Sequence, residues 1–141
     1  MKLYTIGYEK KNIEEYLKIL NDNDIQILID VRERAWSYKR DFCKTRFNSH
    51  LTENGILYLH HKDLGNPKIF RKNITDRKKT LSLYENYLKK TKKGLSELET
   101  VFKNSKQKIC LTCFEKEHLE CHRSIIIKVF SKDKKLQVIN L

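Results

Sequence analysis

Ile25-Gln26-Ile27-Leu28-Ile29-Asp30-Val31 is the stretch of this 141-residue chain that decides the fold. Five of its seven residues are Ile, Leu or Val, which is typical of a central strand in a parallel sheet, buried on both faces. Helical patterns separate this strand from other β-type runs, and such alternation predicts an α/β fold. We expect a single-domain three-layer sandwich, with a mostly parallel five-stranded sheet and helices on both faces. The other strands are expected at residues 3–7, 56–60, 108–114 and 136–141.

The predicted helices have recognisable ends. Asn12 followed by Glu15 is a variant of the capping box, and an apolar stripe with helical spacing follows it. A second helix is expected over residues 44–53, ending at Asn54-Gly55. Gly94 is expected to break a long helical stretch. The remaining helices are expected from about residue 75, over residues 95–102, and from about residue 121.

Length and composition limit the class of protein. A chain of 141 residues is long enough for one domain with a real core, expected over residues 1–141. A hydrophobic content of 39%, with 7 Tyr, 6 Phe and 1 Trp, excludes wholesale disorder. No apolar run approaches the roughly 18 residues that span a bilayer, and the N-terminus does not resemble a secretory signal. We therefore expect a soluble cytoplasmic protein without a membrane partner.

The positive charge is concentrated in one region. The net charge is +12, and residues 61–93 carry 11 basic and 3 acidic side chains. A basic face would attract an anionic small molecule or a nucleic acid in a salt-dependent manner. However, only seven of the 30 basic residues are Arg, so the same charge also fits lysine-rich codon usage or a solvated surface.

The four cysteines do not form a familiar framework. A disulfide scaffold is not expected in a reducing compartment. Cys110 and Cys113 form a C-x-x-C, but they lie in a predicted strand, where residues three apart face opposite ways. The null hypothesis for Cys43 and Cys110 is that each is a small buried hydrophobe.

Polar residues gather where the predicted strands end. Because ligands of open parallel sheets bind beyond the carboxyl ends of the strands, we expect these side chains to form one site. His118, in a charged loop, is instead expected to be solvated. Catalytic candidates are Asp30, Cys113, Glu115 and Cys121. Candidates for binding an anionic substrate are Tyr8, Arg32, Trp36, His60, His122 and Arg123.

The charged candidates each have a functional and a structural interpretation. Asp30 is either a general base or the partner of a neighbouring Arg. Arg32 and Arg123 are either anion-binding forks or ordinary ion pairs. Arg123 falls at a predicted helix N-terminus, where backbone N–H groups also attract anions.

Cys121 stands beside His122 and Arg123 at that helix start, which favours a thiolate. It could act as a nucleophile or ligate a metal with Cys113 and His122, with His60 or His61 as a fourth ligand. The seven residues between the cysteines match no standard zinc spacing, so no metal site is assigned and the cofactor stays open.

The segment 33–47 interleaves basic residues with aromatic ones directly after the central strand. Such a mixture can stack nucleobases and bind phosphates, or it can form a lid that packs on the domain. Both interpretations stay open for its four aromatic residues, Trp36, Tyr38, Phe42 and Phe47.

Several motifs of the chain point to a family. The most specific is Cys113-Phe114-Glu115 followed by Cys121-His122-Arg123, and the others are Tyr4-Thr5-Ile6-Gly7-Tyr8, Asp30-Val31-Arg32 with Trp36-Ser37, Phe47, Gly55-Ile56-Leu57-Tyr58-Leu59-His60, and Leu64-Gly65. In these motifs the chain resembles the domain-of-unknown-function family numbered 488, which usually has His at the position of Tyr8. The resemblance implies a compact α/β fold and no established reaction.

Three functions compete. The first is a small enzyme that acts on a phosphate-bearing or other anionic substrate. The second is a nucleic-acid-binding module in DNA processing or repair, in which the region 61–93 and the aromatic segment bind. The third is a thiol or metal sensor. A pocket with converging titratable groups favours the enzyme, and a continuous basic groove favours the binding module.

Overall fold

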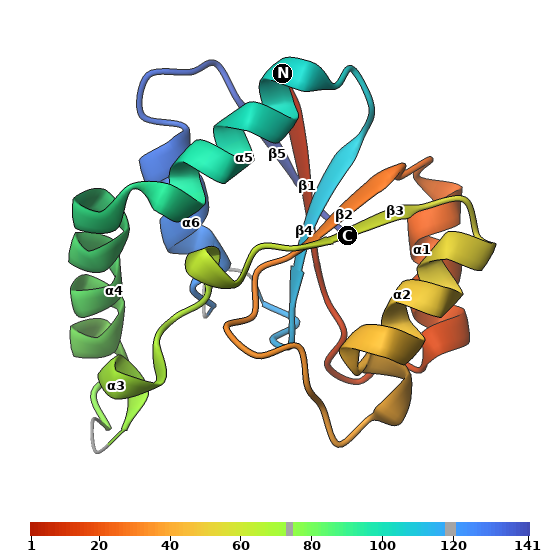
Figure 1. The fold of residues 1–141 in the computed structure, drawn as a ribbon, viewed down its shortest axis with the longest axis horizontal. Helices are drawn as coiled ribbons and strands as arrows, with labels where there is room; N and C mark the ends of the chain where they lie inside the picture. The colour runs from red at the N-terminus through yellow and green to blue at the C-terminus, as the bar shows by residue number, and fades with distance from the viewer. Residues whose placement is uncertain (73–74, 118–120) are drawn as a thin grey trace.

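In the computed structural model, residues 1–72, 75–117 and 121–141 are described, which leaves His118 outside the description. Within these residues, five strands form one sheet (Figure 1). They are β1 (Lys2–Gly7), β2 (Ile27–Asp30), β3 (Leu57–His60), β4 (Ile109–Cys113) and β5 (Gln137–Asn140). Their order is β3-β2-β4-β1-β5, and all neighbours are parallel.

Helices cover both faces of the sheet, with α1 and α2 on one side and α4, α5 and α6 on the other (Figure 1). The bounds are α1 (Ile13–Asp22), α2 (Lys44–Glu53), α3 (Lys68–Arg71), α4 (Arg77–Thr91), α5 (Lys93–Asn104) and α6 (Arg123–Phe130), with the short 3-10 turns η1 (Arg40–Phe42) and η2 (Lys62–Leu64). The three-layer α/β sandwich predicted from the sequence is confirmed. None of the helices in the described ranges is long and apolar enough to cross a bilayer.

The sheet separates two hydrophobic cores. β2 and β4 lie in its centre and are buried along their whole length. Successive residues of β4 point to opposite faces, so Cys110 packs in the core under α1 and α2, whereas Cys113 packs in the core under α4 to α6. This arrangement confirms that the C-x-x-C does not act as a pair.

Helix ends follow the local chemistry with one exception. α2 ends as predicted, and Gly55 adopts a φ of 71° just after it. Asp76 caps α4 by accepting from two backbone N–H groups. The predicted break at Gly94 is wrong: the chain turns at Lys92, which has a φ of 61°. Gly94 lies inside α5, where a Cβ would come within 2.6 Å of the Asp63 carbonyl oxygen, so close packing on η2 requires its small size.

Candidate functional site

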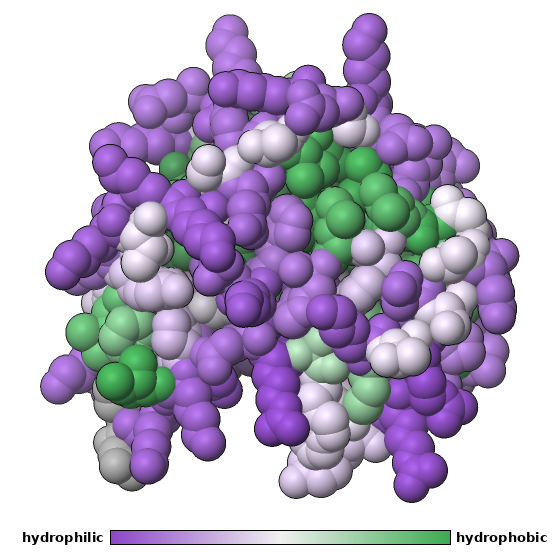
Figure 2. Space-filling model, in the orientation of Figure 1, coloured by the Kyte–Doolittle hydropathy of each residue, from purple (hydrophilic) through white to green (hydrophobic). Residues whose placement is uncertain are grey.

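A cleft of about 870 Å³ opens at the carboxyl edge of the sheet. Its walls are the ends of β1 and β4, the loop after β2, and the segment that contains α3 and the start of α4. Figure 2 shows hydrophilic side chains on both sides of the hollow between α3 and the loop after β2. Six of the residues predicted for the site line this cleft: Tyr8, Arg32, Trp36, Cys113, Glu115 and His122.

The buried Asp30 side chain orients Arg32, which lines the cleft. Its fully buried carboxylate accepts from Arg32 Nε at 2.9 Å and Nη2 at 2.6 Å, and from the Tyr58 hydroxyl at 2.6 Å. Burial disfavours the charged form of Arg32, but the Asp30 carboxylate outweighs burial and raises the pKa of the guanidinium. Arg32 Nη1 donates to the Tyr8 hydroxyl at 3.3 Å. Arg32 is therefore a fixed cation at the cleft surface, and Asp30 is its positioning residue.

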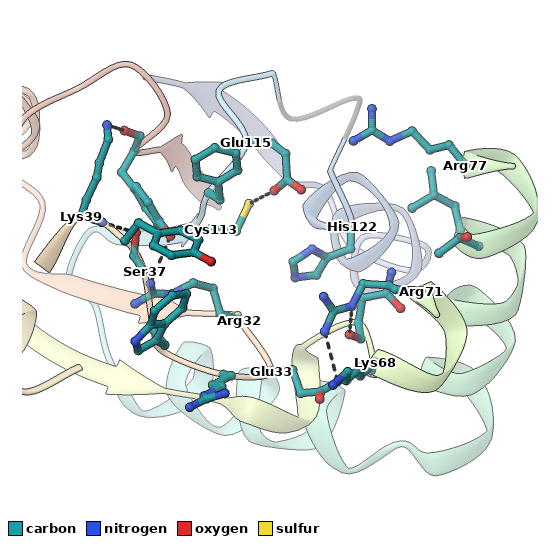
Figure 3. Close-up of a pocket in the computed structure, with 18 of the residues that line it drawn as sticks. Arg32, Glu33, Ser37, Lys39, Lys68, Arg71, Arg77, Cys113, Glu115 and His122 are labelled. Atoms are coloured by element: carbon teal, nitrogen blue, oxygen red, sulfur yellow. Dashed lines mark hydrogen bonds and ion pairs between the residues drawn. The ribbon is translucent and has the colours of Figure 1, made fainter. Parts of the chain in front are cut away.

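Four side chains with metal-ligating or nucleophilic atoms lie close together beside the cleft, and Figure 3 shows the three that line it, Cys113, Glu115 and His122. We call Cys113, Glu115, Cys121 and His122 the Cys/Glu/His cluster, since one donor atom of each lies within 4.8 Å of all the others. Cys113 Sγ donates to Glu115 Oε2 at 3.2 Å, and Cys121 Sγ lies 3.5 Å from His122 Nδ1. The cluster joins the end of β4 to the start of α6.

The environment sets an unusual distribution of protons in the cluster. Burial works against the Cys121 thiolate, but the Cys113 thiol and the charge of His122 hold the pKa of Cys121 well below its ordinary value. Burial likewise disfavours the His122 imidazolium, yet the thiolate beside it raises the pKa of His122. Burial raises the pKa of Cys113, and burial followed by the charge of Cys121 raises that of Glu115. The surroundings therefore favour the charged forms of Cys121 and His122 and the neutral forms of Cys113 and Glu115.

The backbone of Glu115 is held from two sides. A Cβ on Gly7 would lie 1.7 Å from the Glu115 carbonyl oxygen, so the end of β1 can approach only because that residue is Gly. On the other side, the buried guanidinium of Arg123 donates to the same carbonyl and to the Thr5 hydroxyl. These contacts fix the segment that carries half of the cluster.

Positive side chains face the cluster across the cleft. Among the described residues that line the cleft, six are Arg or Lys and two are Glu. We call Lys68, Arg71 and Arg77, from α3 and the start of α4, the basic wall. Glu33 anchors this wall to the loop after β2, because its carboxylate accepts from the Lys68 backbone N–H at 2.6 Å and lies 3.8 Å from Arg71 Nη2 (Figure 3). The wall comes from the basic region that the charge distribution had singled out.

The aromatic residues of the segment 33–47 divide between two roles. Phe42 and Phe47 are buried under α1 and α2 and serve packing. Trp36 is 47% exposed and Tyr38 is 92% exposed, and both line the cleft, with ring centroids 4.6 Å apart. Exposed aromatic rings at a cleft can stack on a planar ligand.

The other four predicted site residues do not line the cleft. Asp30 and Arg123 are buried and hydrogen-bond to buried partners, although Arg123 Nε has no hydrogen-bond partner among the described residues. Cys121 is also buried and does not line the cleft. His60 Nε2 donates to the Arg32 carbonyl at 2.7 Å, so it braces the backbone and does not face the cleft or the cluster. The prediction that the Arg123 guanidinium faces an anion does not agree with this placement.

His61, the other possible ligand, gives a pH prediction instead. Its Nδ1 is buried without a hydrogen-bond partner among the described residues. Burial lowers the pKa of His61, and the charges of Glu97 and Asp63 do not outweigh it. The neutral ring therefore stabilises the fold above the ordinary His pKa of about 6.5, and this contribution is lost as the pH falls through the lowered value.

We therefore expect His61→Gln to lose less stability than the wild type between about pH 7 and about pH 5. Denaturant unfolding at several pH values checks this expectation. Parallel stability curves for the two proteins would contradict it.

Several lining residues could not be singled out from the sequence. The residues of the basic wall were indicated only as members of the charged region 61–93. Gly7 and Tyr58, which contact the residues of the site, were singled out only as members of the family motifs and not for a chemical role. Their roles depend on contacts between segments far apart in the chain.

Comparison with known proteins agrees with the motifs at the cleft. A family model described as "Domain of unknown function DUF488" matches residues 12–130. This range contains the whole Cys/Glu/His cluster, the loop after β2 and the basic wall, while the motif of residues 4–8 lies outside it. No curated protein and no solved structure matches the chain.

Proposed function

Because the chain belongs to the DUF488 family, whose description names no reaction, we propose a function from the cleft itself: a small enzyme that acts on a phosphate-bearing substrate. One observation carries this proposal. The basic wall lines the same cleft as three members of the Cys/Glu/His cluster, Cys113, Glu115 and His122 (Figure 3). The wall binds the phosphate, and the cluster acts on the group attached to it.

Charge and geometry favour phosphate as the bound group. Arg71 Nε donates to the Asn66 carbonyl at 3.0 Å, which orients its guanidinium beside Lys68. Arg34 and Arg32 supply cations from the opposite side. Guanidinium groups bind phosphate oxygens with two parallel hydrogen bonds, and several of them together neutralise a multiply charged anion.

The cluster supplies the chemical groups that a reaction needs. Glu115 lines the cleft, and burial raises its pKa, which favours the protonated form that a general acid needs. The Cys121 thiolate beside His122 is a nucleophile or a metal ligand. Asp30 has no direct part in the reaction, since its carboxylate is fully buried against Arg32 and Tyr58.

A nucleic-acid-binding module is the second candidate. The exposed rings of Trp36 and Tyr38 favour it, because they lie beside the cations of the cleft and could stack on bases. In that case affinity for single-stranded nucleic acid falls steeply with salt, and no small phosphate compound is turned over.

The experiment compares two charge-matched double variants. Lys68→Gln/Arg71→Gln removes two cations of the basic wall, and Lys106→Gln/Lys135→Gln removes two exposed lysines that do not line the cleft. We expect the first variant to bind pyrophosphate about tenfold or more weakly at fixed ionic strength, because two charge-assisted contacts are lost. The second variant should bind like the wild type in calorimetric titrations.

Turnover is followed in the same proteins by mass spectrometry of a panel of nucleotides and phosphate esters. The proposal expects at least one compound that the wild type consumes and the basic-wall variant consumes more slowly. It fails if pyrophosphate binds both double variants equally. It also fails if the panel is untouched while single-stranded DNA binds with a steep salt dependence.

A further inference from the structure

We propose that the Cys/Glu/His cluster binds one divalent metal ion of the zinc class. The site was left unassigned from the sequence, since the seven residues between Cys113 and Cys121 match no standard spacing. The proposal goes beyond the function above and stands independently of phosphate binding. It is carried by the donor set, the distances, the contacts of His122 and the charge of the surroundings.

The donor set and distances suit zinc. Two thiols, an imidazole and a carboxylate are the side chains that bind Zn²⁺ in proteins. Bond lengths of roughly 2.0–2.3 Å in a tetrahedron place ligand atoms about 3.3–3.8 Å apart. Two distances between donor atoms are close to this range: 3.2 Å from Cys113 Sγ to Glu115 Oε2, and 3.5 Å from Cys121 Sγ to His122 Nδ1. All four donor atoms already lie within 4.8 Å of one another, so only a small contraction is needed.

His122 has the arrangement of a metal ligand. Its Nε2 lies 2.9 Å from the Val31 carbonyl oxygen, which can only accept, so Nε2 carries a hydrogen. The other nitrogen, Nδ1, then points into the cluster. A ring that donates one N–H to a backbone carbonyl and offers its second nitrogen to an ion is the usual outer-sphere arrangement of metal-binding histidines.

The charge around the cluster matches a bound ion. Two thiolates and one carboxylate around a divalent cation leave one net negative charge. Arg123 lies against the cluster, because its backbone N–H is 3.5 Å from Cys121 Sγ and its buried guanidinium donates to the Glu115 carbonyl. The guanidinium also donates to the Thr5 hydroxyl, and neither of these two acceptors carries a charge. A buried cation needs a compensating anion, and the loaded cluster would supply it.

The ligands differ in their access to the cleft. Cys113, Glu115 and His122 line it, whereas Cys121 does not. Cys113 and Cys121 are 1% exposed, whereas Glu115 is only half-buried. The two thiolates and the imidazole would therefore be permanent ligands of the ion, and Glu115 would be a fourth ligand that can exchange. An incoming phosphate oxygen could replace its carboxylate.

Metal binding is measured on the full chain, purified without a metal-chelate column. We expect about one equivalent of zinc per chain by elemental analysis after dialysis against Zn²⁺. Co²⁺ in its place should give the thiolate charge-transfer band and the intense visible bands of tetrahedral coordination.

Variants assign the ligands. Cys113→Ser and Cys121→Ser should each weaken Zn²⁺ binding by about 100-fold or more, and Glu115→Gln by about tenfold, since that carboxylate is exchangeable. Cys43→Ser is the matched control, because its sulfur hydrogen-bonds with the backbone of Ser37 and lies outside the cluster. Circular dichroism checks that each variant is folded. If a cysteine variant unfolds, the Glu115→Gln variant still tests the proposal, because Glu115 is only half-buried and its replacement disturbs the fold less.

Two results would overturn the metal proposal. One is a wild-type protein that binds no stoichiometric Zn²⁺ or Co²⁺. The other is a cobalt spectrum that is unchanged in folded Cys113→Ser or Cys121→Ser. The two proposals can fail separately. A wild-type protein that binds stoichiometric Zn²⁺, while pyrophosphate binds both double variants equally, overturns only the phosphate proposal. A wild-type protein that binds no stoichiometric metal, but binds pyrophosphate more tightly than the Lys68→Gln/Arg71→Gln variant, overturns only the metal proposal.

Discussion

Arg123→Ala should lower the free energy of unfolding by about 3–5 kcal/mol, because it removes a buried, hydrogen-bonded cation. The guanidinium is 1% exposed and donates to the Thr5 hydroxyl and the Glu115 carbonyl. Its removal leaves both acceptors without this donor and opens a cavity between β1 and α6. The thiolate of Cys121 also loses the positive charge beside it.

Thermal unfolding checks the Arg123 prediction, with an expected fall in Tm of roughly 10–20 °C. Arg46→Ala is the matched control: its side chain is 60% exposed and pairs with Asp41 at 3.4 Å, so its loss should change stability by less than about 1 kcal/mol. Equal losses for the two variants would show that Arg123 does not hold the edge of the sheet together.

Gly7→Ala should lower the free energy of unfolding by about 3 kcal/mol or more, because the new methyl group meets backbone. A Cβ at this position would lie 1.7 Å from the carbonyl oxygen and 2.3 Å from the carbonyl carbon of Glu115. No side chain can rotate to make room, so either the end of β1 or the Glu115 segment must move. Denaturant unfolding measures the loss.

Gly55→Ala is the control for the Gly7 prediction. Nothing lies within 4 Å of a Cβ at Gly55, and its φ of 71° is the only source of strain, which costs about 1 kcal/mol. A Gly7 variant no less stable than the Gly55 variant would mean that the close approach of β1 to Glu115 is easily relieved.

Local patterns were sufficient to predict the fold. The apolar run before Val31 identified a strand buried on both faces, and the alternation of strands with helices then left little choice of architecture. The break between α4 and α5 could not be predicted in the same way. Sequence rules favour Gly94 as the residue that ends the helix, but the chain turns at Lys92. Gly94 instead has no side chain because the backbone of Asp63, which is distant in the chain, packs against it.

For the candidate site, the sequence predicted the edge of the sheet where its residues gather, but not which side chains line the cleft. The rule for parallel sheets brought Asp30, Cys113 and Arg123 to one edge, as the structure shows. It could not tell which side chains face the cleft, because that depends on buried partners from other segments. Asp30 is saturated by Arg32 and Tyr58, so its carboxylate points away from solvent.

The position of β1 has a consequence for the order of folding during synthesis. This first strand lies between β4 and β5, the last two to be made, with Lys2 opposite Gln137 and Gly7 opposite Cys113. While the ribosome translates the residues between β1 and β4, neither of the two strands that pair with β1 has been made. We therefore infer that the sheet closes late, after a long loop closure, and that until then this segment is a natural target for chaperones.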